Sequence, residues 1–198
     1  MLKAFLRALT SPFVFRKYKD IWGLKLHLLA LKRQKKTNRL LSSIYKNYFY
    51  EHGSYVGLLC QLADAPCMPH GPLGIFIADG AQLGKHVIIF QHVTIGSDNL
   101  IDSENQGSPV IGDDVYIGAG AKIIGNIRIG NNCRIGANAV VYTDMPDNSV
   151  AVCAATRVIQ KQDLDNRFMV PSNEAGWLIC ENSQYRALTD EEMQQYRK

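Results

Sequence analysis

The 198-residue sequence lacks the features that assign a chain quickly to a class. Its five cysteines, at positions 60, 67, 133, 153 and 180, are odd in number and scattered, with no CxxC pair. This spacing argues against a disulfide framework and a zinc site, and it favours a reducing cytoplasm. No apolar run approaches the roughly 20 residues of a membrane-spanning helix. Lys3 and Arg7 interrupt the N-terminal stretch and no small-residue cleavage site follows, so we do not expect a signal peptide.

Acidic residues are almost absent from the first quarter of the chain. Residues 1–46 hold twelve Lys or Arg and one acid, whereas the rest of the chain holds ten Lys or Arg and seventeen acids. Apolar residues at mostly helical spacing predict basic amphipathic helices there. Such helices contact an anionic membrane surface, or they pack against their own domain or a sister subunit. We expect no nucleic-acid partner, because nothing further along resembles a base-reading module.

The sequence is rich in one six-residue pattern. Aliphatic residues recur six apart in two series, and six of the ten are followed directly by glycine. Small or branched residues recur at the fifth place of most hexads. The ten aliphatic positions are Ile77, Leu83, Ile89 and Ile95, then Ile111, Ile117, Ile123, Ile129, Ile135 and Val141.

Neither an α-helix nor a β-hairpin has a period of six. A six-residue unit with one aliphatic residue and a glycine-containing corner indicates a parallel β-helix, whose short strands bury the aliphatic residue inside a three-sided prism. Each coil lies about 4.8 Å above the one before and pairs its backbone with it. We therefore expect an all-β core, preceded by a basic α-helical arm and followed by a short extension.

Four stretches carry a resemblance to a known family: PHGPLGIFI, FQHVTIG, GSPVIGDDVYIGAGAKIIGNIRIG and VYTDMPDNSVAVCAATRVI. Over roughly residues 54–160 the chain resembles the left-handed β-helix acyltransferases. Within them it resembles the serine-acetyltransferase-like branch, which includes capsule and exopolysaccharide O-acetyltransferases. The resemblance implies acetyl-CoA as the donor, a homotrimer with its active sites between adjacent subunits, and a histidine base.

Two histidines fall at one corner of the predicted prism. If three extra residues are allowed between Met68 and Ile77, Met68 lies one coil below Ile89. His70 and His92 then share a corner on neighbouring coils. Small residues continue this corner upward and leave room for the thin pantetheine arm of coenzyme A. They are Ala119 and Gly120 after Ile117, then Ala137 and Asn138 after Ile135.

A serine or sugar hydroxyl is a poor nucleophile at neutral pH, and an imidazole is a suitable base for it. We predict His70 as the base, because it matches the family's catalytic histidine in PHGPLGIFI, and His92 as a substrate or oxyanion partner. The reverse assignment stays open, as does the alternative that both are polar corner residues facing water. His86 lies at a different corner and is expected at the surface. Because only two histidines share a corner, we expect no metal.

The predicted coenzyme A contacts extend beyond the corner. Arg157 and Lys161 follow the last coil, where family members hold the nucleotide, and cations suit a 3′-phosphate. The alternative is that both are ordinary exposed cations. The whole predicted set is Gly118, Ala119, Gly120, Ala137, Arg157 and Lys161.

The chain departs from serine acetyltransferases at two places. That family carries an aspartate one coil before the base, where this chain has Tyr55, and an Arg-His pair late in the loop, where this chain has GSP at 107–109. The acid that orients the base is therefore unassigned. Asp64 is the nearest carboxylate before His70 in the sequence, and Asp98 and Glu104 are candidates from the loop of a neighbouring subunit. Simple solvation of each is the alternative.

The aliphatic series is interrupted between Ile95 and Ile111, which predicts a ten-residue insertion in a polar loop at 97–110. A loop at one corner of a solenoid is a usual place for specificity. Further along, GWLIC is strand-like and the stretch from Thr189 to Glu192 has the pattern of a capping box. We divide the chain into a basic helical arm (1–52), a β-helix acyltransferase domain (53–160) and a C-terminal extension (161–198).

Three functions follow from these patterns. The favoured prediction is an acetyl-CoA-dependent O-acetyltransferase that acetylates a hydroxyl of a polysaccharide or sugar precursor, in the cytoplasm at the inner face of the membrane. The alternative is serine O-acetyltransferase of cysteine biosynthesis. Against it stand the short arm, the missing Arg-His pair and the ending QQYRK, which lacks that family's terminal isoleucine. A non-catalytic trimeric scaffold is the third function considered.

Overall fold

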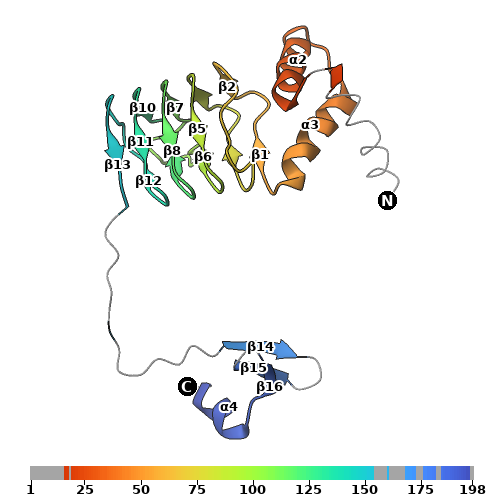
Figure 1. Cartoon of the computed structure of the whole chain (residues 1–198), viewed down its shortest axis with the longest axis vertical. Helices are drawn as coiled ribbons and strands as arrows, with labels where there is room; N and C mark the ends of the chain where they lie inside the picture. Colours follow the sequence, from red (N-terminus) through yellow and green to blue (C-terminus); the bar gives the residue numbers. More distant parts are fainter. Residues whose placement is uncertain are drawn as a thin grey trace. The chain divides into compact units, whose positions relative to one another are not determined.

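The computed structural model describes residues 16–17, 19–153, 160, 168–172, 176–181 and 184–196. The chain divides into two compact units, Met1–Ala154 and Ala155–Lys198, and each is described by itself. Figure 1 shows the first unit as a stack of short strands with two helices at the end where the stack begins.

Three parallel sheets form the sides of this stack, which is a parallel β-helix. Their strand orders are β1-β3-β6-β9-β12, β2-β4-β7-β10 and β5-β8-β11-β13. The strands are Tyr55–Val56 (β1), Gln61–Leu62 (β2), Phe76–Ile77 (β3), Gln82–Leu83 (β4), Ile88–Ile89 (β5), Thr94–Gly96 (β6), Val110–Ile111 (β7), Tyr116–Ile117 (β8), Lys122–Ile124 (β9), Arg128–Ile129 (β10), Arg134–Ile135 (β11), Val140–Val141 (β12) and Val150–Ala151 (β13).

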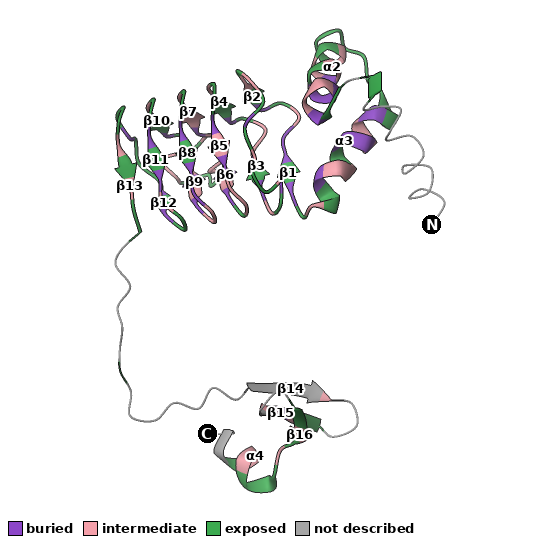
Figure 2. Cartoon of the chain, viewed as in Figure 1, coloured by how far each residue is buried: buried purple, intermediate pink, exposed green. Residues whose placement is uncertain are grey.

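The predicted aliphatic ladder fills the interior of the prism. None of its ten residues is more than 5% exposed. The register stacks Ile77, Ile95 and Ile123 directly above one another, and the other two sides repeat this arrangement. Figure 2 shows the buried residues recurring on strand after strand. The β-helix predicted from the six-residue repeat is therefore confirmed.

Strand pairing shows where the repeat is interrupted. Phe76 pairs with Thr94, 18 residues further on, as an uninterrupted coil requires. Tyr55 pairs with Phe76 after 21 residues, which confirms the three extra residues predicted in the first coil. Thr94 pairs with Lys122 after 28 residues, which confirms the predicted ten-residue insertion.

Two helices, α2 (Ile21–Arg33) and α3 (Arg39–Glu51), cover the first coil (Figure 1). Each begins at a side-chain cap, which satisfies one of the free N–H groups of its first turn. The Asp20 carboxylate accepts a hydrogen bond from the backbone N–H of Gly23 at 2.8 Å, and Asn38 caps α3 in the same way.

The apolar faces of both helices are buried against the β-helix. Leu24, Leu28 and Phe49 belong to the same hydrophobic cluster as Val56 of the first coil. Residues 21–51 thus follow the alternative in which the basic arm packs against its own domain. Membrane contact through these faces of residues 21–51 is not supported, because they are already covered, and residues 1–15 of the predicted arm lie outside the described residues. No described helix is long and apolar enough to cross a membrane.

Two polar side chains of the helices bond to carbonyl groups at the open end of the β-helix. Lys25, only 2% exposed, donates from Nζ to the carbonyl oxygens of Gly57 at 2.9 Å and Leu58 at 2.6 Å. The Tyr45 hydroxyl donates to the carbonyl of Val56 at 3.0 Å. The first coil has no coil beneath it, so these carbonyl groups lack the backbone N–H donors that a further coil would supply. The side chains of Lys25 and Tyr45 donate to them instead. Burial lowers the pKa of Lys25.

The second unit holds a three-stranded antiparallel sheet and a short helix. The strands are β14 (Phe168–Ser172), β15 (Gly176–Glu181) and β16 (Gln184–Ala187), in that order across the sheet. The helix is α4 (Asp190–Tyr196). The strand predicted at GWLIC is confirmed as β15.

The predicted capping box is confirmed at the start of α4. The Thr189 N–H donates to Oε2 of Glu192 at 2.9 Å, and the Glu192 N–H donates to Oγ1 of Thr189 at 3.3 Å. Arg186 also forms an ion pair with Glu192 at 2.7 Å. Chiefly through the hydrogen bond from Arg186, the pKa of Glu192 is lowered to about 2.

Candidate active site

His70 and His92 lie at one corner of the prism, on neighbouring coils. The backbone bridge between Cys67 and Ile88 sets the register of these coils, so the residue directly above His70 is Gln91. We call His70, Gln91 and His92 the histidine corner. The structure places both predicted histidines there, and their catalytic roles stay predictions.

His70 is exposed, and two neighbouring side chains limit its orientation. Its Nδ1 lies 2.8 Å from Oε1 of Gln91, a hydrogen-bond distance. Its ring meets the ring of Phe90 edge to face, with centroids 5.5 Å apart and planes at 85°. Phe90 in turn packs against Tyr116 at 5.2 Å. The imidazole therefore has an amide on one nitrogen and an aromatic surface beside it.

His92 is positioned by its backbone. It has a φ of +61°, and its N–H donates to the carbonyl of Leu73 at 2.9 Å. Its ring lies against Gly74, where a Cβ atom would come within 2.2 Å of Nδ1 of His92. Lys122 donates from Nζ to the carbonyls of His92 at 2.7 Å and Gly120 at 2.9 Å. An ammonium group is therefore fixed beside the second histidine.

Small residues continue the corner upward, as the repeat predicts. The Gly120 N–H donates to the carbonyl of Gln91 at 2.9 Å, which joins the third coil to the histidine corner. Ala119 is half-buried and Ala137 is exposed. Because both residues are alanines, only methyl groups project from the backbone at these positions. Gly118 is buried, and a Cβ at that position would lie 2.7 Å from the backbone nitrogen of Ala137. Glycine at 118 is thus required by the stacking of the coils.

Of the predicted residues His86, Arg157 and Lys161, the structure describes His86 alone. Arg157 and Lys161 lie outside the described residues. The His86 side chain is 70% exposed at another corner, 3.1 Å from Asp114 and 4.0 Å from Asp64, as expected for a surface residue. Within the described part of the chain, no cluster of three or more His, Cys, Asp or Glu side chains could hold a metal ion.

Two of the candidate acids bond to groups away from His70. Both carboxylate oxygens of Asp64 accept the backbone N–H of His86, at 3.0 and 3.2 Å. Asp98 accepts the hydroxyl of Ser103 at 2.5 Å within its own loop, and this hydrogen bond lowers the pKa of Asp98. Glu104 is exposed in the same loop. Within one chain, the described contacts of Asp64 and Asp98 therefore do not orient His70. The approach of Asp98 or Glu104 from a neighbouring subunit stays a prediction.

Tyr55, at the place of the family's aspartate, donates its hydroxyl to Asp79 at 2.5 Å, and this hydrogen bond raises the pKa of Tyr55 to about 12. Tyr55 is therefore bonded away from His70.

Sequence reasoning missed Gln91. The sequence contained the signal for Gln91. Gln91 follows Ile89 by two residues, as His70 follows Met68, so both fall at the same corner of the prism. It was overlooked because only carboxylates were considered as partners for the base.

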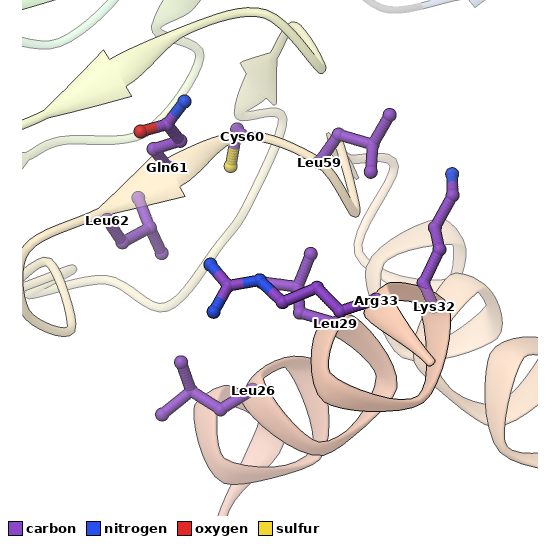
Figure 3. Close-up of a pocket in the computed structure, with 8 residues that line it drawn as sticks. All are labelled: Leu26, Leu29, Lys32, Arg33, Leu59, Cys60, Gln61 and Leu62. Carbon is purple, nitrogen blue, oxygen red and sulfur yellow. The ribbon is translucent and has the colours of Figure 1, made fainter. Parts of the chain in front are cut away.

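A pocket of about 500 Å³ lies between α2 and the first coil (Figure 3). In Figure 3 the guanidinium of Arg33 points toward the strand that carries Gln61 and Leu62. None of the predicted site residues that the structure describes lines this pocket. Its lining is Leu26, Leu29, Lys32, Arg33, Leu59, Cys60, Gln61 and Leu62.

Comparison with known proteins identifies relatives for most of the chain. The family model described as bacterial transferase hexapeptide (six repeats) matches residues 108–143. A serine acetyltransferase of Staphylococcus xylosus is 32% identical over 160 residues, which cover 79% of this chain and 71% of that relative. A serine acetyltransferase of Helicobacter pylori is 40% identical over 92 residues, which cover 46% of this chain and 52% of that relative.

Solved structures agree with the fold. Neisseria gonorrhoeae serine acetyltransferase in complex with serine is 29% identical, with a TM-score of 0.57 over 70% of this chain and 55% of that one. Soybean serine acetyltransferase complexed with serine is 28% identical, with a TM-score of 0.57 over 70% of this chain and 56% of that one. The predicted left-handed β-helix with a helical N-terminal part is confirmed. The chain spans about half the length of several curated relatives that it matches.

The predicted polysaccharide or sugar acceptor is wrong. The relatives and solved structures named above are all serine acetyltransferases, and the capsule and exopolysaccharide branch is not supported. That prediction rested partly on a membrane role for the basic arm, whose described helices pack against the β-helix instead. The alternative given with it, a serine acceptor, fits the comparisons better.

Proposed function

Because the chain belongs to the serine acetyltransferase family, with 71% of the Staphylococcus xylosus relative matched, we propose that it transfers the acetyl group of acetyl-CoA to the hydroxyl of serine. The observation that carries this proposal is the histidine corner, where an exposed imidazole is bonded through Nδ1 to Gln91. The family match supports serine as the acceptor, and the corner supports a general base.

His70 is the proposed base. Its Nδ1 is bonded to Gln91, so Nε2 is the nitrogen that takes the proton of the serine hydroxyl. The oxygen then adds to the thioester carbonyl, and the carbon–sulfur bond breaks as the carbonyl re-forms. His70 then passes this proton to the departing thiolate. Free coenzyme A and O-acetylserine are released, and the imidazole is neutral again.

His92 is the proposed partner of the substrate or of the oxyanion. The backbone N–H of His92 donates to the carbonyl of Leu73, and Lys122 donates to the carbonyl of His92. An ammonium has three N–H donors, so Lys122 retains one beyond its bonds to His92 and Gly120. This charge suits the carboxylate of a serine acceptor.

The donor is expected along the column of small residues. Ala119 and Ala137 present only methyl groups beside the histidine corner, and this leaves room for a pantetheine arm. Gly118 and Gly120 complete the predicted contacts. Arg157 and Lys161 stay predictions for the nucleotide end of coenzyme A, as do a homotrimer with sites between adjacent subunits and a cytoplasmic location.

The test is acetyl transfer by the purified full chain. Free thiol is measured with acetyl-CoA and L-serine, and O-acetyl-L-serine is identified by mass spectrometry. We expect thiol release that depends on serine and is absent with L-alanine, which lacks the hydroxyl. Release that depends on a different hydroxyl compound, with none for serine, would contradict the acceptor and leave the base in place. No release with any hydroxyl compound would contradict the enzyme function itself.

A further inference from the structure

Gln91 is held above His70 by the ladder of the β-helix. The Cys67–Ile88 bridge sets the register, and Oε1 of Gln91 lies 2.8 Å from Nδ1 of His70. The carbonyl of Gln91 accepts the N–H of Gly120 at 2.9 Å, which anchors the residue from the coil above. The fold therefore positions Gln91 before any substrate binds.

This contact determines which nitrogen of His70 carries a proton. A carbonyl-type amide oxygen only accepts hydrogen bonds, so Nδ1 must be the donor. The neutral imidazole then has its lone pair on Nε2, where a hydroxyl proton can be taken up. The edge-to-face contact with Phe90 restrains the ring as well. Together the two contacts fix both the tautomer and the orientation of His70.

The contact from Gln91 comes from the coil above His70, whereas the family's aspartate lies one coil before the base, at the place of Tyr55. Asp64 and Asp98, two of the candidate acids, are bonded to other groups. We propose that Gln91 is the positioning residue for His70, and that this chain uses a histidine–amide pair in place of a histidine–carboxylate pair. This inference rests on the proposed function, in which His70 is the base.

The first readout is spectroscopic and needs no turnover. The ¹⁵N chemical shifts of neutral imidazoles, recorded at alkaline pH on the full chain, distinguish an Nδ1–H from an Nε2–H tautomer. The signals that disappear in His70→Ala belong to His70. We expect the Nδ1–H tautomer in the wild type and its loss in Gln91→Leu. The matched control is Gln82→Leu, which removes an exposed glutamine from β4 and should leave the His70 signals unchanged.

The second readout is kinetic. Gln91→Leu should lower kcat for serine acetylation by about 10- to 100-fold, because the base loses its orientation, while KM for acetyl-CoA stays unchanged. Gln91→Glu retains an oxygen acceptor and should keep kcat within about 3-fold of the wild type. A merely structural role for Gln91 would lower thermal stability in Gln91→Leu and leave the tautomer of His70 as it is.

Each outcome decides a different part of the proposal. An Nε2–H tautomer in the wild type, or a tautomer that Gln91→Leu leaves unchanged, overturns the positioning role. A loss of kcat that Gln91→Glu shares also overturns it. If the tautomer depends on Gln91 but no serine is acetylated, the proposed function fails and the positioning contact stands.

Discussion

Replacing Gly74 with alanine should displace His92 without changing that residue itself. The new Cβ would lie 2.2 Å from Nδ1 and 2.8 Å from Cε1 of His92, well inside a contact distance of about 3.5 Å, so the ring must move away. Gly74 has a φ of +64°, and a residue with a Cβ in this left-handed conformation carries a backbone strain of about 1–2 kcal/mol in addition. We expect a loss of about 1–3 kcal/mol in the free energy of unfolding and a rise of about 10-fold in KM for serine.

Gly53→Ala is the matched control for this substitution. Gly53 has a φ of +60°, and a Cβ there would meet no atom within 4 Å. It carries the same backbone cost without the steric clash. Urea unfolding followed by circular dichroism gives the two free energies, and steady-state thiol release gives kcat and KM. The reasoning is refuted if both variants lose the same stability while Gly74→Ala keeps the wild-type KM for serine.

Three further outcomes are expected. Lys25→Met removes the donor to the buried carbonyl of Gly57 and the partly buried carbonyl of Leu58, and should cost about 1–3 kcal/mol of unfolding free energy in urea. Tyr45→Phe removes one hydrogen bond and should cost about 0.5–1.5 kcal/mol, and no loss in either variant would contradict the capping role. Ala137→Leu should raise KM for acetyl-CoA by about 5-fold or more without changing kcat, and an unchanged KM would place the donor elsewhere. The pKa of Glu192 is about 2 in the folded chain and 4.5 ordinarily, so the stabilisation is complete above pH 4.5 and is lost as pH falls toward 2. A ¹³C titration of Glu192 should show the low midpoint, with a return toward 4.5 in Arg186→Met, and a wild-type midpoint near 4.5 would refute the pairing.

The interior of the β-helix could be predicted from sequence because its constraint is periodic. Every sixth residue must face the prism axis, so Ile117 or Ile135 is buried whatever surrounds it. The same arithmetic located the two interruptions of the repeat and brought His70 and His92 to one corner. These features depend on spacing, and spacing can be counted in the sequence.

The partners of the site residues could not be predicted in the same way. Lys25 and the carbonyl of Gly57 are 32 residues apart and meet only because α2 covers the first coil. Gln91 was overlooked although its position was countable, because a neutral amide was not considered as a partner for the base. The acceptor was mispredicted because the six-residue repeat indicates the fold and does not encode which hydroxyl compound is acetylated.

The central claim is that His70 acts as the base for acetyl transfer to serine. The most direct measurement is the kcat for O-acetylserine formation by His70→Ala at saturating acetyl-CoA and serine. The account predicts a fall of roughly 100-fold or more, because general-base catalysis typically contributes 10²–10⁴-fold, with acetyl-CoA binding preserved. A kcat close to that of the wild type would contradict it.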